Sequence, residues 1–459
     1  MIAPARVAAF DILSAVSADR LDLPSAIARS RTALKDDRDR ALAAEIATGV
    51  QRWRAALDHL IVHFSKRPID RLDPEILEIL RLSLHQLLHL TRVPASAVVD
   101  DAVNLAGRAG KRSAAGFVNG VLRSVSRTRS SLPLPRRPDD PGDRARAIAY
   151  FSITLSHPRW LVERWYDRLG FETAEAWLHF NNRPAPLTLR ANRLRVTPAD
   201  LQARLAALGV TAAPGRFAPD ALVVESGNPL RRPGRVEGLF VVQDEASQLV
   251  ALLAGAHPGP RVLDACASPG GKTTAVAATL DDRGRVVACD VRAGRINLLG
   301  RTVKATGAAN VRVVQADLLS PLPFRAEFDT VLVDAPCSGL GTLRRDPDIR
   351  WRRGEAHLAP LAGAELRMLR HAAQVVRPGG RLIYATCSSE PEENEDIVAA
   401  FLQGSSEFAP LDARRAHPLL PEAVVDERGH LRTTPDRHGL EAFFGAVIER
   451  ARASIGRGR

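Results

Sequence analysis

The C-terminal half of the chain repeats one pattern: a short apolar run, an acidic residue, a turn of small residues and an amphipathic stretch. The clearest apolar runs end at Asp264, Asp290 and Asp334, and further runs cover 311–315 and 380–386. Short apolar runs that alternate with helical patterns predict a parallel sheet covered by helices on both faces. We therefore expect an α/β Rossmann-like domain over 241–450, with its chemistry at the carboxyl ends of the strands.

The N-terminal part, residues 1–128, has a different pattern. Apolar positions recur at helical spacing from about residue 4 to 127, without a strand-like run, which predicts an all-α domain. One helix begins after Pro74 and carries an apolar stripe that is expected to face the core, formed by Ile76, Leu77, Leu80, Leu84, Leu87 and Leu88.

The same helix contains His85-Gln-Leu-Leu-His89, which has the histidine spacing of a zinc-protease helix. Gln86 stands where such an enzyme needs a glutamate as general base, so that class is excluded. A histidine pair at this spacing can still ligate a metal, but packed helix histidines are more common. We predict no metal site.

Two further segments separate these domains. Residues 129–144 hold Pro133, Pro135, Pro138 and Pro141 among charged residues, which predicts a semi-extended linker. Residues 145–240 mix a helix after Pro158, a strand over 187–192 and a helix over 199–208, which predicts a small α+β domain. Arg190 lies near other arginines that either hold a nucleic-acid backbone or form a solvated face.

Charge and cysteine usage limit the classes of function. The chain has 64 Lys+Arg against 52 Asp+Glu, a formal charge of +12, which favours a polyanionic partner over an incidental basic balance. Its cysteines, Cys266, Cys289, Cys337 and Cys387, contain no Cys-x-x-Cys pair, which argues against a zinc site or a disulfide framework. Without a signal-like or membrane-spanning apolar run, we expect a cytoplasmic protein with no membrane partner.

The first strand end reads Asp264-Ala-Cys-Ala-Ser-Pro-Gly270-Gly271-Lys272-Thr273. It is not a phosphate-binding P-loop, because Cys266 occupies the position of the first required glycine, and it lacks the dinucleotide pattern Gly-x-Gly-x-x-Gly.

A turn of small residues lets a ligand lie against the backbone. Asp290 is placed to accept ribose hydroxyls, and Asp317 to meet an adenine amino group. Such acids suit the nucleoside S-adenosylmethionine, although each of them can instead be a helix N-cap.

Two of the thiols lie just past strand ends, in polar turns where a thiolate is reachable: Cys337 and Cys387. Cys289, inside a strand, is expected to be a buried apolar residue. Carbon 5 of a pyrimidine accepts a methyl group only after a thiolate has added to carbon 6. Asp334 would stabilise the charge that this addition creates. The residues leave open which thiol attacks.

The helical region resembles the RNA-binding antitermination factor NusB over about the first 127 residues. The resemblance lies in Arg40-Ala-Leu-Ala-Ala-Glu-Ile-Ala-Thr-Gly49-Val50, Ile79-Leu-Arg-Leu, Val93-Pro94 and Phe117-Val-Asn-Gly120-Val-Leu. It implies a helical module that contacts RNA or a protein partner.

The remaining motifs resemble those of the RNA cytosine-5 methyltransferases of the Sun/NOP family. They are Asp264-x-Cys-x-x-Pro-Gly-Gly-Lys-Thr, Asp334-Ala-Pro-Cys337-Ser-Gly, Arg344-Arg345-Asp-Pro-Asp-Ile-Arg-Trp351 and Tyr384-Ala-Thr-Cys387-Ser with Glu390-Pro-Glu-Glu-Asn394-Glu. The resemblance implies that Cys387 attacks carbon 6, that Cys337 assists release and proton removal, and that Asp334 belongs to the catalytic site. It assigns the cofactor to Cys266, Ala267, Ser268, Pro269, Gly270, Gly271, Lys272, Asp290, Asp317 and Asp334. Ser268 stands where the family is expected to have alanine.

The same resemblance makes the middle domain an RNA-binding extension, with Arg190 and Asn192 in its Arg-x-Asn motif. The basic residues after Cys337 are expected to grip phosphates around a base turned into the pocket: Arg344, Arg345, Arg350, Arg352 and Arg353. The expected substrate is 16S ribosomal RNA, free or in a partly assembled subunit, and the expected state is a monomer with a basic tail over 451–459. The alternatives are a DNA cytosine-5 methyltransferase, in which Cys337 would attack, and a non-catalytic RNA-binding protein.

Overall fold

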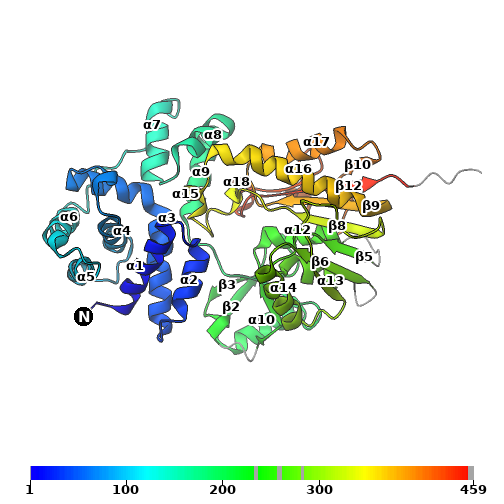
Figure 1. The fold of residues 1–459 in the computed structure, drawn as a ribbon, viewed down its shortest axis with the longest axis horizontal. Helices are drawn as coiled ribbons and strands as arrows, with labels where there is room; N and C mark the ends of the chain where they lie inside the picture. The colour runs from blue at the N-terminus through cyan, green and yellow to red at the C-terminus, as the bar shows by residue number, and fades with distance from the viewer. Residues whose placement is uncertain (1, 232–235, 256–260, 281–283, 453–459) are drawn as a thin grey trace, which may run out of the picture. The chain divides into compact units, whose positions relative to one another are not determined.

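The computed structural model describes residues 2–231, 236–255, 261–280 and 284–452 (Figure 1). The chain divides into unit 1, Met1–Pro184 with Leu343–Glu355, and unit 2, Ala185–Thr342 with Ala356–Arg459. The division at Pro184 falls inside the segment 145–240 that the sequence suggested as one domain. The expected basic tail lies outside the described residues from position 453 onward. Within the described ranges, no helix combines the length and apolar character needed to cross a bilayer.

Unit 1 begins with a helical bundle, and residues 2–127 contain helices and no strand, as the sequence predicted. Asp22 caps the second helix by accepting the N–H of Ser25 at 2.8 Å. The third helix bends at Trp53, whose backbone leaves the helical region. The helices are α1 (Pro4–Ser17), α2 (Leu23–Arg31), α3 (Asp37–Ser65), α4 (Pro74–His89), α5 (Ala95–Arg108) and α6 (Ala115–Arg127).

The expected apolar stripe of helix α4 does face the core, and the rest of the helix from Ile76 to Leu87 is buried as well. Other helices of the bundle surround it, and its charged residues are paired inside the core. Arg81 contacts Glu78 at 2.5 Å and Asp58 at 2.7 Å. A helix surrounded in this way needs internal partners for its charges, because an unpaired buried charge is strongly destabilising.

The histidine pair of α4 is packed in this core. The rings of His85 and His89 stack with centroids 5.1 Å apart, and His89 also stacks on Trp53. Burial lowers the pKa of His85 to about 3 and that of His89 to about 4, so both are neutral at neutral pH. Across the described ranges, no group of three or more histidine, cysteine or acidic side chains is arranged to hold a metal.

The proline-rich segment after the bundle has neither helix nor strand over 132–138, and it is packed against its neighbours. Leu132 and Leu134 contact the bundle core, and Arg137 pairs with Glu175 at 2.9 Å. The segment leads into the remaining helices of unit 1, which are α7 (Arg144–Ala149), the π-helix at Tyr150–Thr154, α8 (Arg159–Leu169) and α9 (Phe171–Asn182).

Unit 2 opens with a small antiparallel sheet in the order β2-β3-β1-β4. The strands are β1 (Thr188–Ala191), β2 (Thr211–Pro214), β3 (Ala221–Ser226) and β4 (Phe240–Val242). Helix α10 (Pro198–Ala207) packs on this sheet through Leu201 and Leu205. The strand and the helix that the sequence predicted in this region are therefore confirmed.

The large sheet of unit 2 has the order β10-β12-β9-β8-β5-β6-β7, with β11 paired to β12. The strands from β5 to β9 pair in parallel, as predicted. The prediction was wrong at the other edge, where β12 runs antiparallel to β9 and the sheet is mixed. The strands are β5 (Arg261–Asp264), β6 (Arg285–Asp290), β7 (Val311–Gln315), β8 (Phe328–Asp334), β9 (Val376–Thr386), β10 (Phe408–Leu411), β11 (Leu431–Thr433) and β12 (Phe443–Arg450).

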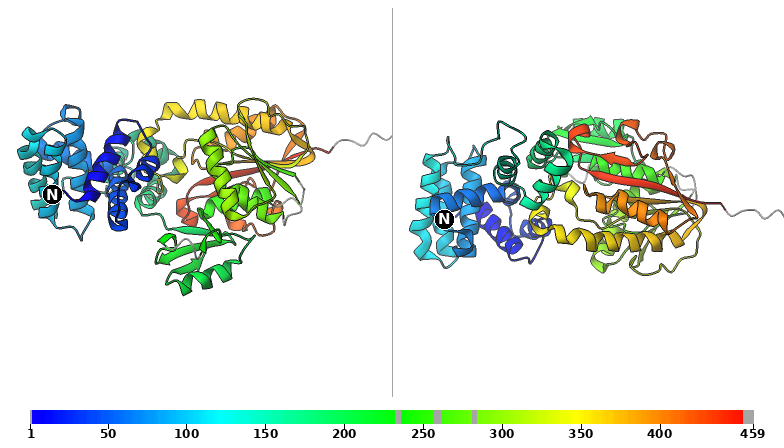
Figure 2. Two further views of the ribbon diagram at one scale, coloured as in Figure 1. Left: turned by 60° about the horizontal axis from the view of Figure 1, so that its bottom comes forward. Right: turned by 90° about the horizontal axis from the view of Figure 1, so that it is seen from above.

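Helices cover both faces of this sheet (Figure 1 and Figure 2). Along β8, Leu332 points into one apolar cluster, while Val331 and Val333 point into the other. Helices α12 (Glu245–Gly255), α13 (Gly271–Thr279) and α14 (Ala293–Thr306) supply the first cluster, and α16 (Leu358–Gln374) and α17 (Glu395–Gln403) the second. Strands buried on both faces leave their carboxyl ends as the place where polar groups gather.

Candidate functional site

The two expected thiols meet at one edge of the large sheet. Strands β8 and β9 are parallel neighbours, with Asp334 paired to Ala385, so the loops that follow them begin side by side. The Sγ atoms of Cys337 and Cys387 lie 3.3 Å apart, and both cysteines are free thiols. The structure therefore brings together two residues that the sequence placed on separate strand ends.

Gly341 joins the two loops through the backbone. Its N–H donates to the carbonyl of Cys387 at 2.9 Å, and its carbonyl accepts the N–H of Ala442 at 3.0 Å. A Cβ atom at position 341 would lie 2.0 Å from the carbonyl oxygen of Ala442. Only glycine lets these backbones approach so closely.

A buried carboxylate, Glu393, connects the residues that follow each thiol. Its Oε1 accepts the backbone N–H of Ser338 at 2.7 Å. Its Oε2 accepts the hydroxyl groups of Ser338 and Ser388, each at 2.5 Å. Sequence reasoning gave Glu393 no role of its own. The available signal was the acidic stretch 390–395, which follows the second thiol directly.

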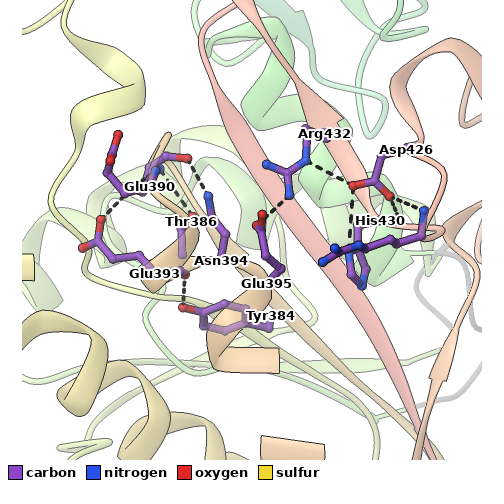
Figure 3. A network of polar contacts seen from close by, with 11 residues as sticks. Tyr384, Thr386, Glu390, Glu393, Asn394, Glu395, Asp426, His430 and Arg432 are labelled. Carbon is purple, nitrogen blue, oxygen red and sulfur yellow. Dashed lines mark hydrogen bonds and ion pairs between the residues drawn. The ribbon is translucent and has the colours of Figure 1, made fainter. Parts of the chain in front are cut away.

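Further contacts hold the segment that carries Glu393 (Figure 3). The Tyr384 hydroxyl lies 2.6 Å from the carbonyl oxygen of Glu393, and the Thr386 hydroxyl bonds to the side-chain oxygen of Asn394. The Asn394 amide in turn donates to the carbonyl of Ser388 at 3.1 Å. The loop after β9 therefore folds back on its own strand.

The electrostatics of this cluster keep one thiol protonated. The hydrogen bond with Cys387 and burial raise the pKa of Cys337 well above its usual range. Burial and the charge of Glu393 raise the pKa of Glu365, on α16, to about 9. At neutral pH, Cys337 is therefore a thiol and Glu365 a neutral acid.

Asp334, at the end of β8, is paired with Lys272 from the start of α13. The Lys272 Nζ lies 2.7 Å from Asp334 Oδ2. Burial alone would lower the pKa of Lys272, but the charge of Asp334 outweighs burial and the pKa is raised. Asp334, which is expected to contact the target base, is thus paired with an ammonium group that stays charged.

The turn after β5 has the shape expected of a cofactor cradle. Gly270 has φ of +104° at the N-terminus of α13, and a Cβ there would lie 2.9 Å from Leu299 Cδ1. Asp290 Oδ2 accepts the N–H of Ser268 at 3.3 Å, which places this carboxylate beside the turn formed by Cys266, Ala267, Ser268, Pro269, Gly270 and Gly271. A bare turn beside a strand-end carboxylate fits S-adenosylmethionine.

The other acids of this region differ in exposure. Asp264 is 1% exposed and accepts the Thr273 hydroxyl at 2.6 Å, and burial raises its pKa to about 7. It therefore ties β5 to α13 inside the core. Asp317 is exposed and accepts the N–H of Leu319 at 2.9 Å, so it shapes the turn after β7. Burial also raises the pKa of Cys266 well above its usual range.

The structure does not support phosphate contacts from Arg190 and Asn192, which are 3% and 2% exposed. Arg190 donates to Thr274 Oγ1 at 2.8 Å, and burial lowers its pKa to about 10. Asn192 donates to the carbonyls of Gly238 at 2.7 Å and Thr306 at 2.8 Å. These side chains join the small sheet to helices α13 and α14, so the expectation that they bind RNA directly is corrected.

Of the basic residues after Cys337, Arg350 was also assigned wrongly. It lies in α15 (Ile349–Arg352), is 0% exposed, and donates to the Ser156 carbonyl at 3.0 Å and to Asn182 Oδ1 at 3.1 Å. Its role is therefore to hold residues 343–355 in unit 1. Arg344 and Arg345 are half-buried, and the Arg344 guanidinium lies over the Phe180 ring, 4.4 Å from its centroid.

The large sheet, the bare turn after β5 and the acids at successive strand ends define the class of this protein. It is a methyltransferase that uses S-adenosylmethionine as its cofactor.

Comparison with known proteins identifies the family. The family described as 16S rRNA methyltransferase RsmB/F matches residues 251–449, the NusB family matches 3–127, and the ferredoxin-like domain of RsmF/B-like methyltransferases matches 157–231. A probable ribosomal RNA small subunit methyltransferase B of Bacillus subtilis is 34% identical over 89% of this chain and 90% of its own length. A putative methyltransferase of Mycobacterium tuberculosis is 36% identical over 97% of this chain and 96% of its own.

The solved structure of PH0851 has the same fold, with a TM-score of 0.79 at 24% identity over 98% of this chain and 99% of that chain. The chain therefore belongs to the RsmB/F family of 16S rRNA methyltransferases. The family resemblance that the sequence motifs suggested is confirmed, as is the expected combination of a NusB-like domain, a small α+β domain and a Rossmann-like domain.

Proposed function

We propose that this protein transfers a methyl group from S-adenosylmethionine to carbon 5 of a cytosine in RNA, through a covalent bond between Cys387 and carbon 6. The observation that carries the proposal is the pair of thiols, 3.3 Å apart, at the strand end that also presents Asp334. Methylation of a weakly nucleophilic ring carbon needs a thiolate, and the loops after β8 and β9 supply two sulfur atoms at one place.

In the first step, the Cys387 thiolate adds to carbon 6 and the ring electrons move toward carbon 5. Asp334, held by Lys272, hydrogen-bonds the ring near nitrogen 3 and stabilises the charge that appears there. Bound S-adenosylmethionine supplies the electrophilic methyl group. The residues from Cys266 to Gly271, with Lys272, Asp290, Asp317 and Asp334, would hold the cofactor and orient it toward the base.

Release reverses the addition. The carbon 5 proton passes to a solvent water molecule, the electron pair of the broken C–H bond restores the ring double bond, and the bond between carbon 6 and the Cys387 sulfur breaks. The sulfur departs as a thiolate. Cys337, a thiol because its pKa is raised, donates a hydrogen bond to this departing sulfur.

We propose 16S ribosomal RNA as the substrate, free or in a partly assembled small subunit. Relatives that cover about nine-tenths of the chain carry the name ribosomal RNA small subunit methyltransferase B, and residues 3–127 match the NusB family. Arg344 and Arg345 are half-buried and follow the loop that contains Cys337. We propose that they contact phosphates of the RNA. Two free thiols that take part in the reaction stay reduced in the cytoplasm, so we propose that the protein is cytoplasmic. We also propose that it acts as a monomer.

Bisulfite sequencing of ribosomal RNA from cells with and without the gene tests the substrate. We expect one methylcytosine signal in the small-subunit RNA to disappear with the gene. An unchanged pattern would overturn the substrate assignment.

RNA containing 5-fluorocytosine tests the chemistry, because the fluorine blocks release and traps the covalent complex. We expect the complex to form with the unmodified protein and not with Cys387→Ala. A complex that survives Cys387→Ala and is lost in Cys337→Ala would reverse the roles of the two thiols and favour the DNA-type mechanism.

A further inference from the structure

We propose that Glu393 is a positioning residue that holds the two thiol-bearing loops together through Ser338 and Ser388. The proposal concerns the arrangement of the thiols and rests on the proposed function for its catalytic consequence. Each serine directly follows one of the thiols in the sequence, so a shift of either serine moves the neighbouring sulfur atom.

The contacts form a single bridge between the two loops. Glu393 Oε2 accepts both serine hydroxyls at 2.5 Å, and Oε1 accepts the Ser338 backbone N–H at 2.7 Å. The two hydroxyl oxygens lie 3.3 Å apart, the same separation as the sulfur atoms beside them. A charged acceptor makes shorter and stronger hydrogen bonds than a neutral one, which suits an element that must fix a distance.

Burial gives this bridge its rigidity. Glu393 is 0% exposed and both serines are 1% exposed, so water does not compete for their hydrogen bonds. The Tyr384 hydroxyl, 2.6 Å from the Glu393 carbonyl oxygen, also anchors the backbone of the bridging residue to β9 (Figure 3). A buried carboxylate is a poor source of stability compared with an apolar residue of the same size. Its presence between two loops is explained by the geometry that it imposes on them.

The same contacts indicate that Glu393 positions the thiols and does not react itself. Both carboxylate oxygens of Glu393 are engaged by residues that follow the thiols. Glu393 therefore acts on the reaction through the loops that carry Cys337 and Cys387.

The distance between the thiols can be measured without substrate by oxidation with diamide. Diamide takes two electrons and two protons from a thiol pair and becomes a hydrazine, while the sulfur atoms form a disulfide. In the full-length protein we expect rapid formation of the Cys337–Cys387 disulfide, located by mass spectrometry of unreduced peptides. In Glu393→Ala we expect this rate to fall by at least about tenfold, as the loss of charge-assisted hydrogen bonds implies.

The matched control is Glu395→Gln. Glu395 lies on the same segment, but its carboxylate pairs with Arg432 at 2.7 Å (Figure 3). We expect its oxidation rate to match that of the unmodified protein. A Glu393→Ala protein that forms the disulfide as fast as the control would overturn the proposal.

A second pair of variants covers the case in which Glu393→Ala does not fold. Ser338→Ala with Ser388→Ala removes both hydroxyl donors and leaves the carboxylate. We expect slower disulfide formation than in either single variant. An unchanged rate in the double variant would again overturn the bridge.

Methylation provides the catalytic readout. We expect Glu393→Gln to lower kcat by about tenfold while KM for S-adenosylmethionine stays unchanged, because the cofactor turn is not altered. An unchanged kcat would remove the catalytic consequence. If no variant, and not even the unmodified protein, methylates RNA, the proposed function fails, whereas the oxidation result still decides whether Glu393 holds the thiols.

Discussion

The sulfur atoms of Cys337 and Cys387 lie 3.3 Å apart, although fifty residues separate them in the chain. The parallel pairing of β8 with β9 brings the loops together, and Gly341 and Glu393 fix their separation. Two thiols in such contact can divide one reaction between bond formation and release.

This division predicts different fates for RNA in the two cysteine variants. With ordinary RNA and S-adenosylmethionine, Cys337→Ala should accumulate a covalent protein–RNA complex, because release is slowed while addition continues. Cys387→Ala should form none. Denaturing electrophoresis of labelled RNA measures both, and equal amounts of complex in the two variants would contradict the assigned roles.

The Lys272–Asp334 pair predicts a loss of rate when its charge is removed. Lys272→Met should lower kcat by about a hundredfold, the scale seen when one preorganised electrostatic contact is removed from an active site. Lys304→Met, an exposed lysine on α14, is the control and should leave kcat unchanged. Steady-state methylation assays measure both variants, and an unaffected Lys272→Met protein would exclude a role for the pair.

Gly341→Ala should destabilise the protein, because the new Cβ would meet a backbone carbonyl oxygen at 2.0 Å. Backbone has to move, and we expect a loss of about 3 kcal/mol. Gly300→Ala is the contrasting variant. Gly300 lies in helix α14, and a Cβ added there would have no neighbouring atom within 4 Å. This substitution should stabilise the folded protein by about 0.5–1 kcal/mol. Thermal denaturation followed by circular dichroism separates them, and a Tm for Gly341→Ala equal to that of the unmodified protein would contradict the close approach.

Glu365 predicts a pH dependence of stability. Its pKa is raised from 4.5 to about 9, so the folded protein keeps a proton that the unfolded chain loses. The stability associated with this proton is fully present below pH 4.5 and is lost as the pH rises toward 9. Glu365→Gln removes the effect, so its Tm should exceed that of the unmodified protein more at pH 8 than at pH 5. A difference in Tm between the two proteins that stays constant with pH would show that Glu365 is ionised in the folded protein.

Arg350 predicts a variant that affects stability and leaves RNA affinity unchanged. Its guanidinium donates to buried carbonyl groups, which a lysine cannot satisfy with the same planar geometry, so Arg350→Lys should lose about 3 kcal/mol. Arg352→Lys, with a side chain 43% exposed, is the control for charge-preserving replacement. RNA filter binding should give equal affinities for both, and weaker binding by folded Arg350→Lys would restore a phosphate-contacting role.

The strand ends were predictable because burial on both faces makes each strand a continuous apolar run, and the runs stop at Asp264, Asp290 and Asp334. The antiparallel strand β12 was not predicted, because its pairing with β9 is set by contacts distant in sequence. The placement of both thiols at one sheet edge followed from topology. Their division of labour came from family resemblance alone.

Burial of charged residues was the main failure of the sequence analysis. Arg190 and Arg350 lie among other arginines and were expected to be exposed, yet they are 3% and 0% exposed. Glu393 lies in an acidic stretch that is typical of a solvated turn. Their buried partners are distant polar groups: the Thr274 hydroxyl for Arg190, the Ser156 carbonyl and the Asn182 side chain for Arg350, and two serines for Glu393. Nothing in the local sequence identifies such partners.

Residues 343–355 lie within the sequence of the catalytic domain but belong to unit 1, where Arg350 is fully buried. A fragment that begins near residue 241 would carry this segment without Ser156 or Asn182 to receive its guanidinium. The chain therefore cannot be shortened to its methyltransferase domain by a single cut. We expect an excised catalytic fragment to aggregate unless residues 343–355 are redesigned for exposure or the first 184 residues are supplied alongside.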